Sequence, residues 1–306
     1  MHFDDKLQVN DFGFLERNNF DYLHWEVRKR ITDLPSDSRY LDHDWHFRLD
    51  ALDNDDRHLT LRRELRINRS DDLRDGSTEF WQINIDSAGW DDLLTRSHNA
   101  LHLPPLINTH WDRTSPRHGN WAYKAQVEFY TGGLGGNHEV GFDAKFIPTY
   151  FVTDNFSVYA GPYYEHTPDW LIWQHDNLIG RYNQHTLELD SGFDWYIGDR
   201  SELRLKLQAI GLDARIRSAY EVAANGAATP SNEPVNDLRL RQLGVQLRYR
   251  YELAPLSYLY VVYGRGGFAL DDVPGVVSGA PSQLGSAFSL RDDEQILVKL
   301  DYRFEM

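Results

Sequence analysis

Charged side chains recur at every second position along several stretches of this 306-residue sequence. Alternate residues of a β-strand point to the same face of a sheet, so each stretch would present one charged face. Both signs occur, which suits ion pairs that offset one another's desolvation. The candidate residues are Arg62, Glu64, Arg66, Arg204, Lys206, Arg248, Arg250, Lys299, Asp301 and Arg303. They would line the polar passage or plugged interior of a barrel, or form the solvated face of a soluble sandwich.

Histidines and acidic residues also gather between positions 88 and 120, where they could bind a metal ion. They are His98, His102, His110 and His118, with Asp91, Asp92 and Asp112. Metal ligands must converge on one point, and this spacing matches no compact motif such as His-x-x-x-His on a helix. We interpret them as polar loop residues and expect neither a metal nor another cofactor.

Two further patterns resemble functional sites without completing them. Residues 53–56, Asp-Asn-Asp-Asp, resemble the start of a calcium-binding loop, but His58 stands where such a loop needs Gly. An exposed hairpin turn is the better interpretation. Ser191 and His185 could belong to a Ser/His/Asp site, yet the sequence contains no Gly-x-Ser-x-Gly nucleophile motif. We therefore assign no catalytic residue and leave enzyme activity open.

These side chains would be positioned by strands, because apolar and polar residues alternate over most of the chain. In the final segment Ile296, Val298, Leu300, Tyr302 and Phe304 share one face, while Lys299, Asp301, Arg303 and Glu305 share the other. No helical period competes with this pattern. Twelve strands are predicted, over residues 22–31, 40–52, 57–69, 78–87, 121–130, 138–150, 156–174, 178–197, 202–216, 238–252, 257–268 and 292–305. Several exceed the ~5–6 residues usual in soluble sheets and fit the about 9–11 residues of a tilted membrane span.

The composition narrows the class of protein. A formal net charge of −15 argues against a nucleic-acid partner. No run of 18 apolar residues occurs, which excludes a transmembrane helix, whereas a membrane barrel escapes hydropathy averaging because its strands alternate. Aromatic residues on the apolar faces are expected to form belts at the membrane interfaces. They are Trp25, Trp45, Trp81, Trp121, Trp195, Tyr249 and Tyr302.

We therefore predict an all-β fold, an antiparallel transmembrane β-barrel of about 12–14 strands that forms a single domain over residues 1–306. The final strand would pair with the first, and the chain could also be an incomplete piece of a larger barrel. Residues 88–120 are expected to be a long irregular loop or plug, unless they hide a strand near Leu101 to Ile107. The predicted location is the bacterial outer membrane, with membrane lipid as a partner.

Three segments resemble a known family. They are Val9-Asn10-Asp11-Phe12-Gly13-Phe14-Leu15 followed by Arg17-Asn18, the loop from Pro104-Pro105 to Trp121, and Ser257–Tyr263 together with the final Leu297–Phe304. They resemble the C-terminal region of a bacterial family of unknown function, over most of the chain. Members of that family carry an N-terminal domain similar to family-nine carbohydrate-binding modules, and some are labelled membrane-associated hydrolases. The resemblance implies that an N-terminal sandwich domain, either alone or together with the first barrel strands, is missing from this segment of the full-length protein.

Three functions are compatible with these observations. The first is an outer-membrane barrel that anchors the N-terminal glycan-binding domain or serves as its conduit. The second is an outer-membrane hydrolase with an active site at the rim of the barrel. The third is a soluble carbohydrate-binding β-protein with exposed Trp side chains.

Overall fold

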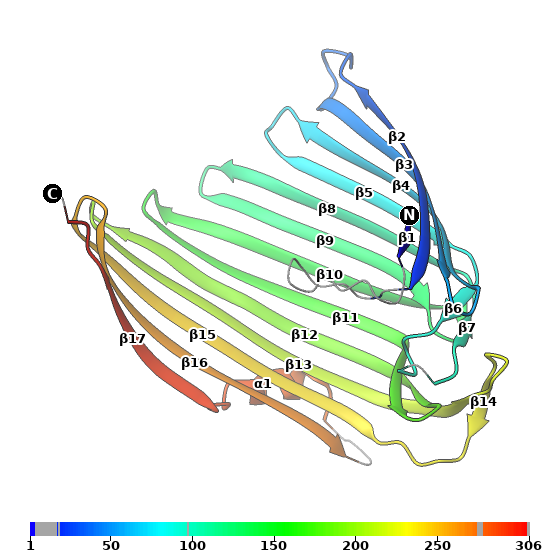
Figure 1. Ribbon diagram of the computed structural model, residues 1–306. Helices are drawn as coiled ribbons and strands as arrows, with labels where there is room; N and C mark the ends of the chain where they lie inside the picture. Colours follow the sequence, from blue (N-terminus) through cyan, green and yellow to red (C-terminus); the bar gives the residue numbers. More distant parts are fainter. Residues whose placement is uncertain (4–16, 18, 97, 274–277, 305–306) are drawn as a thin grey trace.

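The alternating sequence folds into one large antiparallel sheet in the computed structural model of this protein (Figure 1). The structure describes residues 1–3, 17, 19–96, 98–273 and 278–304. Within them the sheet has 15 strands, and its neighbours follow the chain in the order β1-β2-β3-β4-β5-β8-β9-β10-β11-β12-β13-β15-β16-β17, with β14 beside β13. The all-β antiparallel prediction is therefore confirmed, while the predicted count of 12–14 strands is too low.

The long strands carry most of the sheet. They are β2 (Phe20–Ile31), β3 (Tyr40–Asn54), β4 (Leu59–Leu73), β5 (Thr78–Asp86), β8 (Leu106–His118), β9 (Trp121–Gly132), β10 (Gly136–Thr153), β11 (Phe156–His175), β12 (Leu178–Ile197), β13 (Ser201–Val222), β15 (Asp237–Ala254), β16 (Ser257–Val273) and β17 (Asp293–Asp301). The short elements are β1 (His2–Phe3), the separate pair β6 (Gly89–Asp91) and β7 (Leu101–Leu103), β14 (Ala228–Ser231) and the helix α1 (Ala280–Ala287). Strands as short as β1 and β14 are too brief to show alternation, which is one reason for the low predicted count.

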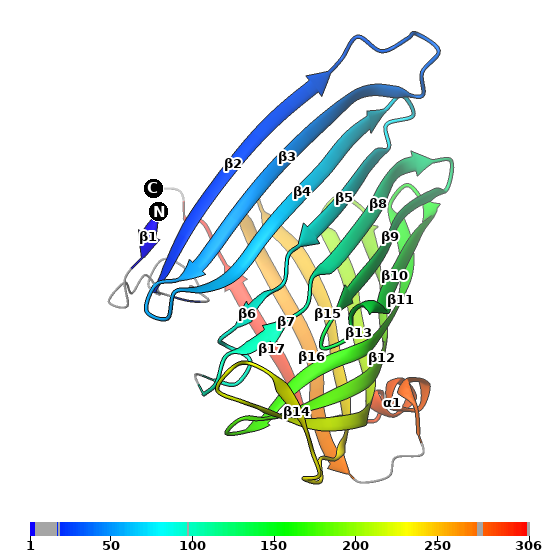
Figure 2. The ribbon, with the colours of Figure 1, turned by 90° about the vertical axis from the view of Figure 1, so that its right-hand side faces the viewer.

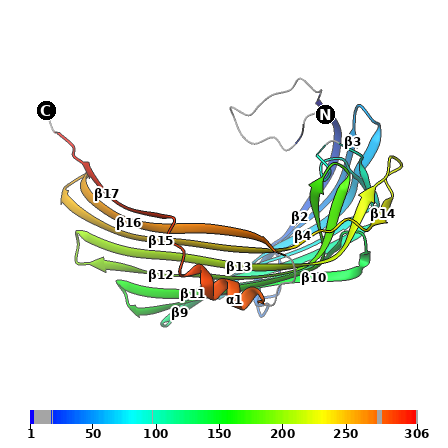
Figure 3. The same ribbon diagram turned by 90° about the horizontal axis from the view of Figure 1, so that it is seen from below.

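The sheet is curved, and its two faces differ in chemistry. Figure 3 shows α1 against the convex side of the curve. The helix packs there on Ala209 and Leu243 through Ala287, so the apolar rows of β13 and β15 belong to the convex face. Because side chains alternate along each strand, the charged rows occupy the concave face.

The two ends of the strands also differ. One end, here called the turn end, carries the connections 32–39, 74–77, 119–120, 154–155, 198–200 and 255–256. The opposite end, the loop end, carries the long connections 87–105, 223–236 and 274–292 together with three short ones. The segment 87–105 reaches the far part of the sheet at this end, since the Asn99 side chain donates to the Val222 carbonyl and the His102 amide donates to the Gly226 carbonyl (Figure 2).

Residues 88–120 need a correction over part of their length. The expected loop or plug contains β8, a strand of the main sheet that pairs with both β5 and β9. The alternative prediction for this segment is a strand near Leu101 to Ile107. The strand of the main sheet begins at Leu106 instead. Its pattern was obscured because Thr109 and Arg113 interrupt the apolar row of Ile107 and Trp111. With β8 included, the connection before it falls at the loop end, beside the other long connections.

Closure is the second correction. The sequence predicts that the final strand pairs with the first, but in the described part of the chain β17 pairs with β16, and its other edge is free of main-sheet strands. The sheet is therefore open between β17 and β2, as Figure 3 shows. Among the described residues, no helix combines the length and apolar character needed to cross a membrane.

Candidate functional site

The predicted charged rows do lie together on the concave face, and their ion pairs centre on acidic side chains. In β4 the carboxylate of Glu64 is buried and lies 2.8 Å from the Arg66 Nη2 and 3.6 Å from the Arg62 Nη1. Beside it in β3, the buried Asp50 accepts hydrogen bonds from Arg48 at 3.0 Å and from the Tyr22 hydroxyl at 2.6 Å. Each strand thus supplies both the anion and the cation that neutralises it.

A second centre lies across two neighbouring strands of the C-terminal half, β13 and β15. Glu202 on β13 is only 3% exposed, and three guanidinium groups surround it. Its carboxylate lies 2.9 Å from Arg204, 3.1 Å from Arg248 and 3.1 Å from Arg250. The register brings them together because Glu202 faces Arg250 and Arg204 faces Arg248 across the β13–β15 ladder. Here Glu202 is the centre, and sequence reasoning did not single it out.

The remaining candidates lie on or near the same face. Lys206 faces Gln246 and Gly192 on the neighbouring strands. Lys299 pairs with Asp301 at 2.8 Å on β17, where both side chains are largely exposed. Arg303 follows the end of β17, and its main-chain N–H donates to the Ser257 hydroxyl. These residues extend the charged surface but do not enter the buried centre around Glu202.

An acidic region that sequence reasoning missed lies between the two centres. Glu128, Asp143 and Glu165 stand on β9, β10 and β11, with Glu128 opposite Asp143 and Asp143 opposite Glu165. Glu165 accepts hydrogen bonds from the Tyr130 hydroxyl at 3.2 Å and from Tyr163 at 3.3 Å. Strand alternation could have revealed these side chains, but only the pairing register shows that they are neighbours.

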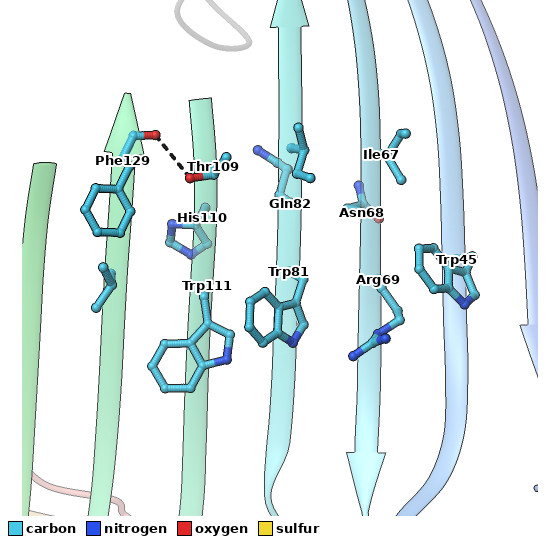
Figure 4. A pocket seen from close by; sticks show the side chains of 12 residues that line it. Trp45, Ile67, Asn68, Arg69, Trp81, Gln82, Thr109, His110, Trp111 and Phe129 are labelled. Carbon is cyan, nitrogen blue, oxygen red and sulfur yellow. Dashed lines mark hydrogen bonds between the residues drawn. The ribbon is translucent and has the colours of Figure 1, made fainter. Parts of the chain in front are cut away.

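The convex face carries an aromatic groove of about 550 Å³ over β3, β4, β5, β8 and β9 (Figure 4). Its indole rings come from Trp45, Trp81 and Trp111 on three of these strands, and the last two have ring centroids 5.9 Å apart. Arg69 lies among them, with its guanidinium over the Trp45 ring and its Nε bonded to Asp71 at 2.9 Å. The groove thus presents apolar rings with one neutralised cation among them.

The histidine group from the sequence does not converge. His98 and His102 lie in the connection 87–105, where the His102 ring packs against Trp90. His110 lies in the middle of β8 between Asp112 and Glu128. His118 ends β8 at the turn end, pairing with Trp121. A single metal site built from these four residues is therefore not formed.

The calcium-loop-like residues 53–56 and the Ser191/His185 pair do not form the sites that they resemble either. Asp53 pairs with Arg63. Asp55, which is partly buried, lies near the exposed His2 and Asp21, and these three side chains are possible metal ligands. Ser191 and His185 are six positions apart on β12, which is about 20 Å along an extended strand. His185 instead stacks on His166 with ring centroids 4.5 Å apart. The Ser/His combination considered above is thus not assembled.

One titratable contact joins two connections at the loop end. His175 lies at the tip of the β11–β12 hairpin, and its Nε2 is 2.7 Å from the Glu233 carboxylate. The hydrogen bond to Glu233, followed by one to Asp176, raises the pKa of His175 above its usual value. Protonation therefore strengthens the contact between the hairpin and the connection 223–236.

No curated protein matches the sequence. Among solved structures, LpxR from Salmonella typhimurium is similar at 11% sequence identity and a TM-score of 0.25, over 71% of this chain and 85% of that chain. A likeness at this level assigns no activity. The sequence model of a family described as a domain of unknown function, DUF5916, matches residues 2–303. The segment Val9 to Leu15, which contributes to the resemblance noted above, lies outside the described residues.

Proposed function

The chain belongs to the DUF5916 family of domains of unknown function, and from the chemistry of its two faces we propose that it is an outer-membrane β-barrel wall. In this proposal the convex face contacts the hydrocarbon of the bilayer and the concave face lines the lumen. The barrel anchors an N-terminal glycan-binding domain of the same full-length protein or serves as its conduit.

The observation that carries this proposal is the exposed apolar convex face. Trp25 and Leu49 there are 57% and 49% exposed, and Val298 at the far side of the sheet is 65% exposed. Among the described elements, α1 covers only part of β12, β13 and β15 on this face. Soluble monomers rarely expose large contiguous apolar patches, so a face of this extent needs an apolar environment.

Aromatic positions support a membrane interface near the turn end. Trp121 packs against Tyr150 beside the connection 119–120, with tilted rings whose centroids are 4.7 Å apart. Phe156 and Trp195 form a similar pair beside the connection 154–155. Trp and Tyr are enriched where bilayer meets water, and short connections are typical of the periplasmic end of outer-membrane barrels. The turn end is therefore the periplasmic end in this proposal.

The concave face supports a polar lining rather than an apolar core. Two of its buried carboxylates, Glu64 and Glu202, are neutralised in place by neighbouring arginines. The N-terminal domain enters the proposal through the family resemblance described above. A soluble carbohydrate-binding protein is disfavoured because it would leave the apolar convex face in water. A hydrolase with a rim site is disfavoured in this segment because Ser191 and His185 lie apart.

The proposal is tested by purifying the full-length protein in detergent and transferring it into phospholipid vesicles. We expect heat-modifiable mobility on gels, retention in vesicles after carbonate washing, and protection of the convex strands from protease. Release of a folded protein into aqueous buffer without detergent would contradict the proposal. Swelling of the vesicles in oligosaccharide solutions would distinguish a conduit from an anchor.

A further inference from the structure

Among the residues that the structure describes, both edges of the open sheet carry long rows of backbone groups with no strand beside them. In the described part of the chain, β2 pairs with β3 along its whole length, but with β1 only at Phe20 and Asp21. At the other edge, β17 pairs with β16 alone. Backbone N–H and C=O groups in a bilayer must find partners within the protein, so a membrane wall requires that these two edges be filled.

The strand directions determine what can fill the gap. Every consecutive pair from β2 to β17 is antiparallel, and thirteen strands take part. The first and last of an odd number of alternating strands run in the same direction, so β2 and β17 both run from the loop end to the turn end (Figure 1). Direct pairing of these edges would be parallel, whereas outer-membrane barrels are antiparallel with an even number of strands.

A second copy of the chain does not solve this problem. Two copies in one membrane are related by an axis along the bilayer normal, and rotation about that axis leaves every strand direction unchanged. The β17 edge of one copy would therefore meet the β2 edge of the other in parallel as well. The gap needs an odd number of additional strands that begin and end with the direction opposite to β2.

The additional strand that lies next to β2 is already begun by β1. His2 faces Asp21 and Phe3 faces Phe20 in antiparallel register. The same ladder continues one residue further, because the Met1 amino group donates to the Tyr22 carbonyl at 2.7 Å and the Tyr22 amide donates to the Met1 carbonyl at 2.8 Å. If residues before Met1 continued in this register, they would pair in turn with Leu23, His24 and Trp25 of β2.

We propose that an odd number of strands from the N-terminal part of the full-length polypeptide completes the wall, and that the last of them is continuous with β1. This proposal rests on the barrel function above. Directly opposed residues of two strands point to the same face. The residue immediately before Met1 therefore faces lipid beside Leu23, and alternate residues before it lie beside Trp25 and Val27. This segment is an amphipathic strand with apolar side chains at those positions.

Disulfide trapping in the full-length protein tests this register, since these 306 residues contain no cysteine. Met1 and Tyr22 exchange both backbone hydrogen bonds, so the next pair is non-hydrogen-bonded, with Cα atoms about 4.5 Å apart. That spacing suits a disulfide. We expect Leu23→Cys to cross-link in high yield with a cysteine placed immediately before Met1. The matched control, a cysteine one residue earlier, points to the opposite face and should yield at least tenfold less.

A second pair tests direct closure. Trp25→Cys with Val298→Cys should give no cross-link in the full-length protein, because other strands separate β2 from β17. Cross-linking between Trp25→Cys and Val298→Cys would overturn the proposal. Cross-linking of Leu23→Cys with the control cysteine only would also overturn it. The same holds if Leu23→Cys forms no cross-link with the cysteine before Met1 although the variant keeps heat-modifiable mobility. Failure of the proposed function gives a different result. In that case the cross-link between Leu23→Cys and the cysteine before Met1 forms, but the protein does not enter vesicles.

Discussion

At the scale of single residues, Glu202 is the acidic side chain that forms ion pairs with three arginines at once. Three arginines point at one carboxylate that is almost wholly removed from solvent. The sequence allowed this neighbourhood to be anticipated only in part. Alternation places Arg204 and Lys206 on one face, and Glu202 follows by the same rule. The contribution of Arg248 and Arg250 depends on the β13–β15 register, which alternation alone does not determine.

Replacing this carboxylate should be costly. In Glu202→Gln the three guanidinium groups lose their common anion, and breaking a buried ion pair typically costs about 3–5 kcal/mol. We expect a loss of this order in the free energy of unfolding, measured by urea titration of the protein in lipid vesicles. The control is Asp154→Asn, because Asp154 is 94% exposed beside Arg117 and such surface pairs contribute about 0–1 kcal/mol. Equal effects of the two substitutions would show that Glu202 is not a buried centre.

The His175 contact predicts a pH dependence at the loop end, outside the proposed membrane span. Its pKa is raised in the folded protein, mainly by the hydrogen bond to Glu233. The stabilisation is therefore complete below the unfolded pKa of about 6.5 and is lost as the pH rises through the raised folded value. In an NMR titration, Glu233→Gln should move the pKa of His175 down toward the ordinary value. An unchanged pKa in this variant would exclude Glu233 as the main cause.

At the scale of elements, the long strands could be predicted because one physical pattern dominates them. The predicted range 178–197 coincides with β12, and the predicted range 121–130 lies within β9. β8 was missed where Thr109 and Arg113 interrupt the apolar row. The helix α1 was missed because it has only eight residues inside a Gly, Pro and Ser-rich connection. Such a short helix is stabilised by the surface on which it packs rather than by its own sequence.

The position of α1 depends on a glycine in the strand beneath it. A Cβ atom on Gly211 would lie 2.1 Å from the Leu284 main-chain nitrogen. Gly211→Val should therefore push the helix off β13 and leave the sheet in place. We expect limited trypsin digestion to cut after Arg291 at least several times faster in this variant. Gly244→Val on β15 is the control, since its Cβ would meet no atom within 4 Å. Equal cleavage in both variants would mean that α1 does not need this close contact.

At the scale of the whole molecule, the sequence indicates two chemically different faces, but it does not determine how the sheet curves or where it ends. Alternation is a property of each strand alone, whereas closure depends on strand number and direction across the whole sheet. The predicted pairing of the last strand with the first took no account of direction. Counting β8 makes β2 and β17 parallel to one another, and this is why direct closure between them is unfavourable.

The orientation of the faces can be tested with neighbouring residues of one strand. Leu247 on β15 lies between Leu205 and Tyr263 on the convex face, while Gln246 lies between Lys206 and Gly264 on the concave face. Arginine on a lipid-facing strand costs about 2–4 kcal/mol at the bilayer midplane and about 0–1 kcal/mol near the interfaces. Leu247→Arg should therefore lower the free energy of unfolding in vesicles by that larger amount, and Val298→Arg should behave in the same way. Gln246→Arg should change it by less than about 1 kcal/mol, because a polar lumen accepts the charge. If all three substitutions cost the same, the apolar convex face is not in contact with lipid.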